Sequence, residues 1–272
     1  MKKILVPTDF SECANVASET AIKLAKNNDA EIVFLHYMTI PIDWIHLQYV
    51  DERLYPDVNK MVKNANSKLD ELVNEADKED VVSRHFIAYN EDISDIPKYF
   101  KQFDIDQVVM GSQGAKGARE FFLGSNAQRI IRQSNIPVLI VKHKLDHISK
   151  PTIVFVSDYE LERLTGFRKI VEFADAMKAN IQLLYINTPD NFLDTWTINE
   201  KMQKFLELTM GGTLRTHIID AIDFESGLAK YLKGVNGGIV AMVSHQIGIL
   251  NRDTKAESLV NHLENPVLNV KD

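Results

Sequence analysis

Residues 4–9 read Ile4-Leu5-Val6-Pro7-Thr8-Asp9, and residues 153–158 read Ile153-Val154-Phe155-Val156-Ser157-Asp158. Both begin as a short apolar run suited to a buried strand, and both end on a hydroxyl residue followed by aspartate. A second correspondence, at a shift of 129 positions, relates Asn135–Val141 to Glu264–Val270 near the ends of the two halves. The sequence therefore predicts one folding unit that is present twice.

Each half alternates short apolar runs with longer stretches of helical periodicity. In the first half the expected strands are residues 4–6, 32–37, 81–88, 106–110 and 138–141, and the expected helices are 13–27, 58–76, 93–103 and 126–133. Strands that alternate with helices pair in parallel within a doubly wound sheet. We expect an α/β protein of two tandem doubly wound domains, residues 1–145 and 151–272, joined by a short polar linker.

The composition is that of an ordinary globular protein, with 272 residues, 45% hydrophobic and 25% charged. The net charge of −7 argues against nucleic acid and anionic membranes as partners. No stretch is apolar over the roughly 18 residues that a membrane span needs, and the N-terminal apolar run is too short for a signal peptide. The single cysteine, Cys13, suits a reducing compartment, so we expect a cytoplasmic protein. The eight histidines lack metal-ligand spacing, and we predict no metal site.

Glycine is scarce and unevenly placed in this chain. The 12 glycines are about 4% of the residues, against a usual value of roughly 7%. The first 150 residues hold four of them, all between Gly111 and Gly124, where a strand ends and a helix begins. Ser125 can cap that helix, with Gln128 completing a capping box. A glycine loop that leads into a helix N-terminus favours an anion such as phosphate, although a tight surface loop is the simpler alternative.

The spacing Gly111-x2-Gly114-x9-Gly124-Ser125 resembles the nucleotide-binding signature of the universal stress protein family. The segments Lys3–Ser11 and Ser134–Val141 strengthen the resemblance, which covers the first half closely and the second half more weakly. It implies a five-stranded parallel sheet of order 3-2-1-4-5, with helices on both faces. It also implies binding of ATP, or of ADP or AMP, either alone or together with a bound Mg²⁺ ion.

The resemblance further implies which residues contact the nucleotide. By position, Asp9 would accept hydrogen bonds from the ribose and Tyr37 would read the adenine edge with its backbone. The remaining expected contacts are Pro7 and Thr8 beside the base, Met110 and Gly111 beside the sugar, and Gly114, Gly124, Ser125, Asn126 and Ala127 at the phosphates. Three of these residues have a structural alternative. Asp9 could cap the first helix, a role that is compatible with ribose binding. Tyr37 and Met110 could be packing residues, a role that does not exclude a ligand contact.

The second half has lost the glycine signature. Val243, Gln246 and Asp253 stand where the first half has its signature glycines, and Thr254 alone keeps the hydroxyl position. An aspartate at that helix start would repel a phosphate. We therefore expect no binding of ATP in the family manner in this half. The repeat also acts as a control, because the same fold without these glycines indicates that the first half keeps them for a ligand.

The sequence favours a stress-response regulator with one competent nucleotide site. No general base, nucleophile or set of metal carboxylates is visible around the glycine loop, so we assign no catalytic residue, and slow ATP hydrolysis stays open. The alternatives are a ligand-free protein-interaction module and an adenylating enzyme of the same broad fold. The fifth strands, Val138–Val141 and Val267–Val270, are expected to pair within the chain as a pseudo-dimer. A homodimer and an unidentified protein partner stay open.

Overall fold

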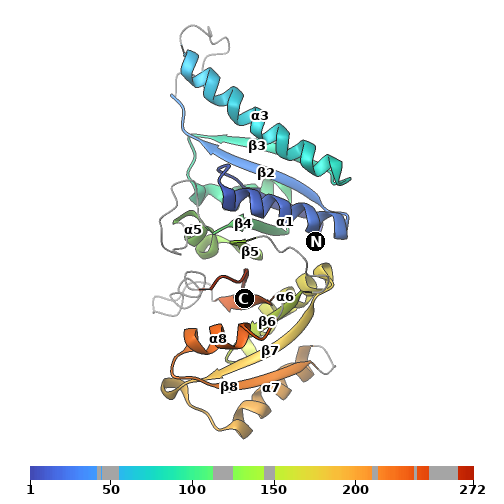
Figure 1. The fold of residues 1–272 in the computed structure, drawn as a ribbon, viewed down its shortest axis with the longest axis vertical. Helices are drawn as coiled ribbons and strands as arrows, with labels where there is room; N and C mark the ends of the chain where they lie inside the picture. Colours follow the sequence, from blue (N-terminus) through green and yellow to red (C-terminus); the bar gives the residue numbers. More distant parts are fainter. Residues whose placement is uncertain are drawn as a thin grey trace.

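The computed structural model describes residues 1–41, 44, 55–112, 125–143, 151–209, 214–235, 238–244 and 263–272. Within these residues ten strands form one sheet of order β3-β2-β1-β4-β5-β10-β9-β6-β7-β8 (Figure 1). Each half contributes five parallel strands in the order 3-2-1-4-5. The predicted fold class is therefore confirmed.

The elements follow the predicted alternation along the chain. The first half consists of β1 (Lys3–Pro7), α1 (Glu12–Asn28), β2 (Glu31–Met38), α3 (Pro56–Lys78), β3 (Ser83–Tyr89), η1 (Ile93–Asp95), α4 (Ile96–Phe103), β4 (Gln107–Gly111), α5 (Ser125–Gln133) and β5 (Val138–Val141). The second half consists of β6 (Thr152–Val156), η2 (Leu161–Arg163), α6 (Leu164–Met177), β7 (Asn180–Asn187), η3 (Pro189–Asn191), α7 (Thr195–Thr209), β8 (Arg215–Asp220), α8 (Phe224–Leu232), β9 (Gly238–Ser244) and β10 (Val267–Lys271). The stretch 93–103, expected as one helix, is divided into η1 and α4.

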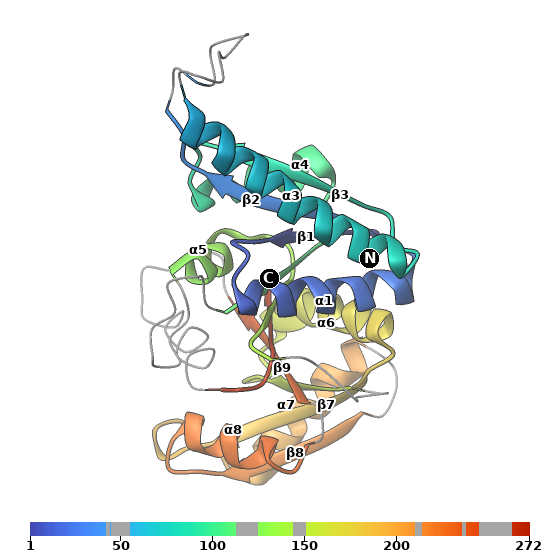
Figure 2. The same ribbon diagram turned by 45° about the horizontal axis from the view of Figure 1, so that its top comes forward.

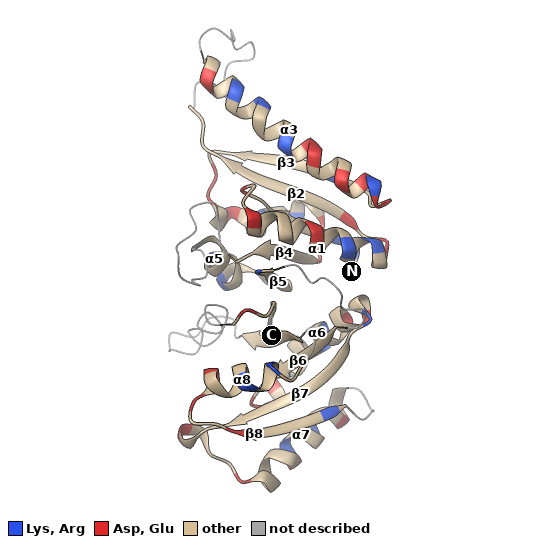
Figure 3. Ribbon diagram, in the orientation of Figure 1, with Lys and Arg blue, Asp and Glu red and all other residues tan. Residues whose placement is uncertain are grey.

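The central strands are apolar on both faces because helices cover both faces of the sheet. Ile4 and Val6 of β1 belong to a buried cluster with α1, α3, α6 and α7, whereas Leu5 belongs to a second cluster with α4, α5 and α8. This division follows from the strand period of two, which sends successive side chains to opposite faces. Charged residues of both signs are interspersed along the exposed side of α3 (Figure 3).

The two halves meet through their fifth strands. β5 and β10 pair antiparallel, with Leu139 opposite Leu268 and Val138 opposite Asn269, which confirms the pairing expected from the sequence. On one face α1 and α6 lie side by side across this junction (Figure 2). There the Asn28 side-chain amide donates to the backbone oxygen of Ala176 at 2.9 Å. The result is one continuous sheet with a shared core.

Candidate functional site

The candidate site lies at the carboxyl ends of β1 and β4. The chain fills the sheet from β1 towards β3 on one side and continues with β4 and β5 on the other, so the strand order reverses between β1 and β4. Loops that leave adjacent strands in opposite directions open a crevice, and ligands of open α/β sheets bind at this switch point. The turn after Pro7 and the end of β4 at Gly111 therefore flank the position where a ligand is expected.

The turn after β1 is held by its own side chains. The Thr8 hydroxyl accepts a hydrogen bond from the Phe10 amide at 3.1 Å, and the Asp9 carboxylate accepts one from the Ser11 amide at 3.0 Å. Phe10 takes the left-handed conformation with a φ of 62°. The carboxylate of Asp9 is nevertheless exposed. The turn thus presents this carboxylate at the edge of the sheet.

Ser11, and not Asp9, is the N-cap of α1. Its hydroxyl accepts a hydrogen bond from the Ala14 amide at 3.2 Å, and its backbone is extended, as an N-cap residue requires. The structural alternative for Asp9, that it caps the first helix, is therefore wrong. A helix has one N-cap, and here the chain needs two more residues after Asp9 before the first helical turn at Glu12.

His36 supports the same turn from the neighbouring strand, a role that the sequence analysis missed. Its Nδ1 lies 2.8 Å from the backbone oxygen of Thr8, which requires the tautomer with a proton on Nδ1 for donation. The Phe10 ring lies against the imidazole, with 4.5 Å between ring centroids. The position of histidine at the end of the second strand is the only sequence signal for this contact.

Tyr37 and Met110 both take part in packing, the structural role that was expected beside a ligand contact. Met110 is buried, and the Tyr37 ring meets the ring of Tyr99 edge to face, with 6.4 Å between centroids. The Tyr37 hydroxyl is buried and has no hydrogen-bond partner among the described residues. Burial, with smaller contributions from Tyr99 and nearby carboxylates, raises the pKa of this hydroxyl. An orphaned donor of this kind is a group that a bound molecule or water could satisfy.

Gly111 was predicted from the sequence to contact the ligand. In the structure it also has a packing role. A Cβ at this position would lie 2.7 Å from the carbonyl carbon and oxygen of Cys13 at the start of α1. The strand register confirms that Val243 is its counterpart, because Gly111 pairs with Val141 and Val243 pairs with Val270. In the second half the close approach uses Gly166 on α6 instead, whose Cβ would lie 2.6 Å from a Val243 methyl group. Packing by itself therefore requires glycine at position 111, and the expectation that the fold does not need this glycine is wrong.

The phosphate end of the expected site is described only in part. Gly114 and Gly124 lie outside the described residues, as does any cap that precedes α5. Ser125 is the first residue of α5, and Asn126 after it is exposed. Ala127 is only 2% exposed, so its methyl group packs into the core and only its backbone amide could serve a ligand. The start of α5 carries the positive end of the helix dipole.

An ion pair fastens α5 to η1. Arg129 donates from Nη1 to both carboxylate oxygens of Asp92 at 2.9 Å, and Asp92 also accepts the Ser94 amide as the cap of η1. The hydrogen bonds from Ser94, and then the charge of Arg129, lower the pKa of Asp92. Because both partners are half exposed, this pair adds little to stability. It fixes where the first turns of α5 lie.

At the corresponding edge of the second half, the aspartate is paired with the side chain of Arg163. Asp158, the counterpart of Asp9, accepts hydrogen bonds from Nε and Nη2 of Arg163 at 3.3 and 3.4 Å. Arg163 is 9% exposed and also donates to Asp272 at 3.4 Å. Burial by itself raises the pKa of Asp158, but the hydrogen bonds and charge of Arg163 outweigh it and lower the pKa. Gln246, Asp253 and Thr254 lie outside the described residues.

In the part of the chain that the structure describes, no helix is long and apolar enough to cross a bilayer. None of the His, Cys, Asp and Glu side chains in this part gather in groups of three or more that could hold a metal ion.

Comparison with known proteins gives one consistent family. A family model described as "Universal stress protein family" matches residues 1–142. Universal stress protein YxiE of Bacillus subtilis is 30% identical over 145 residues, which are 52% of this chain and 98% of that protein. Universal stress protein MJ0577 of Methanocaldococcus jannaschii is 28% identical over 155 residues, 53% of this chain and 96% of that protein. The crystal structure of a universal stress protein from Archaeoglobus fulgidus covers 99% of this chain and 96% of its own, with a TM-score of 0.72 and 20% identity, and so shows a shared fold.

Proposed function

The chain belongs to the universal stress protein family, and from this premise we propose that its first half binds an adenine nucleotide as a stress-response regulator. The nucleotide-binding domain comprises residues 1–145. Residues 151–272 form a domain of the same fold without a competent site. ATP is the proposed ligand, with ADP and AMP as the alternatives and Mg²⁺ as an optional companion.

The observation that carries this proposal is the position of Asp9, Met110 and Gly111. Asp9 follows β1, and Met110 and Gly111 end the adjacent strand β4, at the point where the strand order reverses. The exposed Asp9 carboxylate suits a ribose diol, because a carboxylate can accept two hydrogen bonds. The start of α5, with the backbone amides of Ser125, Asn126 and Ala127, suits a phosphate chain.

Three further features support the same assignment. Pro7 and the buried Thr8 are the proposed contacts of the base, and His36 contacts the Thr8 carbonyl oxygen in the same turn. The end of β2 at Tyr37 offers backbone groups for the adenine edge, beside an orphaned hydroxyl. Gly114 and Gly124 complete the proposed phosphate contacts. All of these groups bind and orient a nucleotide, which is the chemistry of a regulator, and bound Mg²⁺ would neutralise phosphate charge.

A comparison of the two halves tests the proposal. We expect the purified protein to release an adenine nucleotide on denaturation, detected by mass spectrometry, and to bind ATP, ADP or AMP in calorimetric titrations. Asp9→Asn should weaken binding at least about tenfold, because it replaces a charged acceptor by a neutral amide. Gly124→Asp should abolish binding.

Asp158→Asn is the matched control, because Asp158 occupies the same position in the second half and is held by Arg163. It should leave nucleotide affinity unchanged, although it will lower stability. The release of no nucleotide together with no calorimetric binding would instead favour a ligand-free interaction module. Slow release of phosphate from bound ATP would identify a weak ATPase that uses the same site.

A further inference from the structure

Lys271 of the second half reaches across the junction into the first half. It is the last residue of β10 and is only 8% exposed. Its ammonium donates a hydrogen bond to the backbone carbonyl oxygen of Arg132 in α5. A buried ammonium must find polar partners to offset the loss of water. The second half thus places a positive charge at the end of a helix that belongs to the other half.

The Arg132 carbonyl is one of the groups that a helix cannot satisfy internally. Arg132 is the last residue but one of α5, and the final four carbonyls of a helix lack intrahelical partners. They also carry the negative end of the helix dipole, where a cation is favourable. The contact with Lys271 is therefore both a hydrogen bond and a favourable charge–dipole interaction at the C-terminus of α5.

The second half also fixes Lys271 itself. The backbone oxygen of Lys271 accepts a hydrogen bond from the Lys169 ammonium of α6 at 2.8 Å. Along β10, Lys271 is in register with Ser244 of β9. These contacts hold the backbone of Lys271 in place within the second half, and its side chain extends from there to α5.

We propose that Lys271 is a positioning residue for the nucleotide site of the first half. This inference rests on the proposed function, in which the start of α5 holds the phosphates. A helix of nine residues is about 13 Å long, so a shift of its C-terminus moves its N-terminus as well. The exposed Arg129–Asp92 pair also contacts α5, but solvent screens it, so it holds the helix less firmly than the buried Lys271 contact. The second half, without a competent site of its own, thereby sets the affinity of the first.

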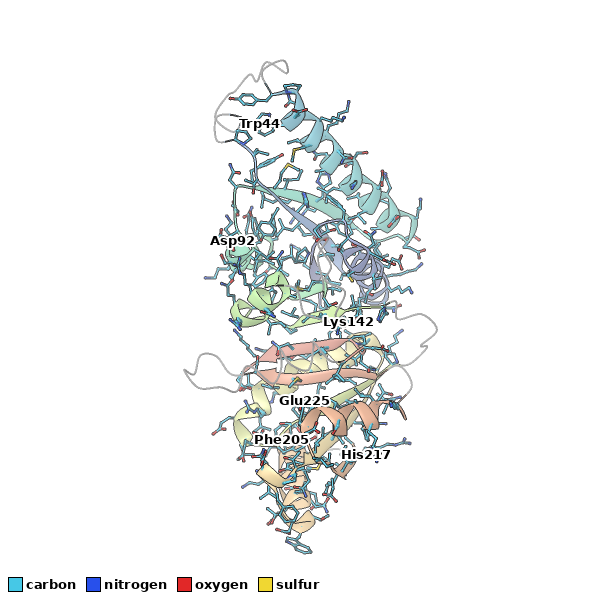
Figure 4. All side chains as sticks on the ribbon, turned by 60° about the vertical axis from the view of Figure 1, so that its left-hand side comes forward. Trp44, Asp92, Lys142, Phe205, His217 and Glu225 are labelled. Atoms are coloured by element: carbon cyan, nitrogen blue, oxygen red, sulfur yellow. The ribbon has the colours of Figure 1, made fainter. Side chains whose placement is uncertain are left out.

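Lys142 provides a matched control within the same chain. It stands 129 positions before Lys271, directly after β5, and is equally buried at 7% exposure. It lies at the junction between the halves (Figure 4), close enough to Glu264 of the second half for that carboxylate to act on its charge. Burial lowers the pKa of Lys142 and the Glu264 charge acts in the opposite direction. Because β5 and β10 pair antiparallel, Lys142 and Lys271 stand at opposite ends of this pairing, so loss of Lys142 removes a buried junction lysine from the other end of the junction.

The experiment compares the full-length wild type with Lys271→Met, Lys271→Arg and Lys142→Met. Hydrogen exchange measured by mass spectrometry should show α5 exchanging on the order of fivefold faster in Lys271→Met, and calorimetry should show the Kd for ATP raised by a similar factor. Lys271→Arg should restore both values, because it keeps the charged donor. Lys142→Met should lower the melting temperature about as much as Lys271→Met does. It should leave the hydrogen exchange of α5 and the Kd for ATP at wild-type values.

Each contrary result has a separate meaning. Unchanged α5 exchange in Lys271→Met would overturn the anchoring, and faster exchange with an unchanged Kd would overturn its effect on the site. An equal change in Lys142→Met would reduce the result to a general weakening of the junction. Failure of the wild type to bind ATP would overturn the proposed function and with it the effect on affinity, while exchange would still decide the anchoring. Should Lys271→Met not fold, Lys271→Gln takes its place. It keeps only a neutral donor, so α5 exchange and the Kd should change in the same direction but by less than about fivefold.

Discussion

At the residue scale, the two halves use the same aspartate in different ways. Asp9 is exposed at the edge of the sheet, whereas Asp158 is engaged by the buried guanidinium of Arg163. The second half thus carries its own cation where the first half offers a carboxylate to solvent. Arg163 stands at the position of Ala14 in the first half, so one substitution supplies the group that closes this edge.

The Asp158–Arg163 pair predicts how stability depends on pH. A carboxylate whose folded pKa is lowered gives stability that is complete above its unfolded pKa, about 3.9, and is lost as pH falls through the folded pKa. Arg163→Met should therefore reduce the loss of stability between about pH 5 and pH 2 while lowering stability at pH 7. Urea unfolding at a series of pH values measures the free energy of unfolding in both proteins. The difference between them should be small, because Asp158 is partly exposed and solvent screens its charge.

The variant Asp158→Asn is the companion measurement. It removes the titrating carboxylate and keeps the guanidinium. Its loss of stability between about pH 5 and pH 2 should therefore match that of Arg163→Met. An equal loss of stability on acidification in the wild type and both variants would show that this pair contributes nothing to acid sensitivity.

At the element scale, the two halves solve one packing problem by opposite means. In the first half α1 approaches β4 closely because the strand has Gly111, and in the second half α6 approaches β9 because the helix has Gly166. The glycine lies on the strand in the first half and on the helix in the second half. A side chain at position 111 would collide with Cys13, and one at position 166 would collide with Val243. This exchange explains why Val243 is compatible with the same fold.

Two alanine substitutions test this exchange. Gly111→Ala should destabilise by about 1–3 kcal/mol, because the new Cβ meets backbone atoms of Cys13 that cannot move aside. Gly166→Ala should cost a similar amount through its contact with the Val243 methyl groups. Val243→Ala should offset the Gly166→Ala loss and leave the Gly111→Ala loss unchanged, as measured by denaturant unfolding in double-mutant cycles.

Gly234→Ala is the control, since its Cβ would meet only the Tyr231 carbonyl oxygen at 3.5 Å, an ordinary contact. It should change stability by less than about 1 kcal/mol. An additive result for Gly166→Ala with Val243→Ala would show that the two residues do not share the predicted contact.

At the scale of the whole molecule, the two halves share one sheet and one core. Leu139 and Leu268 belong to the buried cluster on one face, and Val138 and Val267 belong to the cluster on the other. Since both clusters cross the junction of β5 and β10, separation of the halves would expose apolar surface on both faces. The two halves should therefore depend on each other for stability.

We expect a single cooperative unfolding transition for the whole chain. In a Trp196→Phe variant the fluorescence of Trp44 reports on the first half, while far-UV circular dichroism reports on both halves. The two denaturant curves should coincide, as for one cooperative unit. Leu268→Asp, which places a carboxylate in the buried pairing opposite Leu139, should separate them. Curves that differ in the wild type would contradict the expectation of a shared core.

The predictable features are those set by local sequence. Apolar runs bounded by polar turns located the five strands of the first half, and the alignment of residues 135–141 with 264–270 led to the correct pairing of the fifth strands. Lys142 and Lys271 are the next aligned pair, and their burial at the junction was not predicted. The capping of α1 by Ser11 was missed because Asp9 and Ser11 are equally good cap residues by type.

The sequence by itself determined the fold class, the repeat and the residues that reach the carboxyl ends of the strands, because periodicity and strand order are local or pairwise properties of the chain. Tertiary structure decided the rest. The packing role of Gly111 depends on where Cys13 lies, the closure of the second edge depends on Arg163 meeting Asp158, and the support of α5 depends on Lys271. Each of these is a contact between segments brought together by folding, and its existence depends on distances of a few ångströms that no residue type specifies alone.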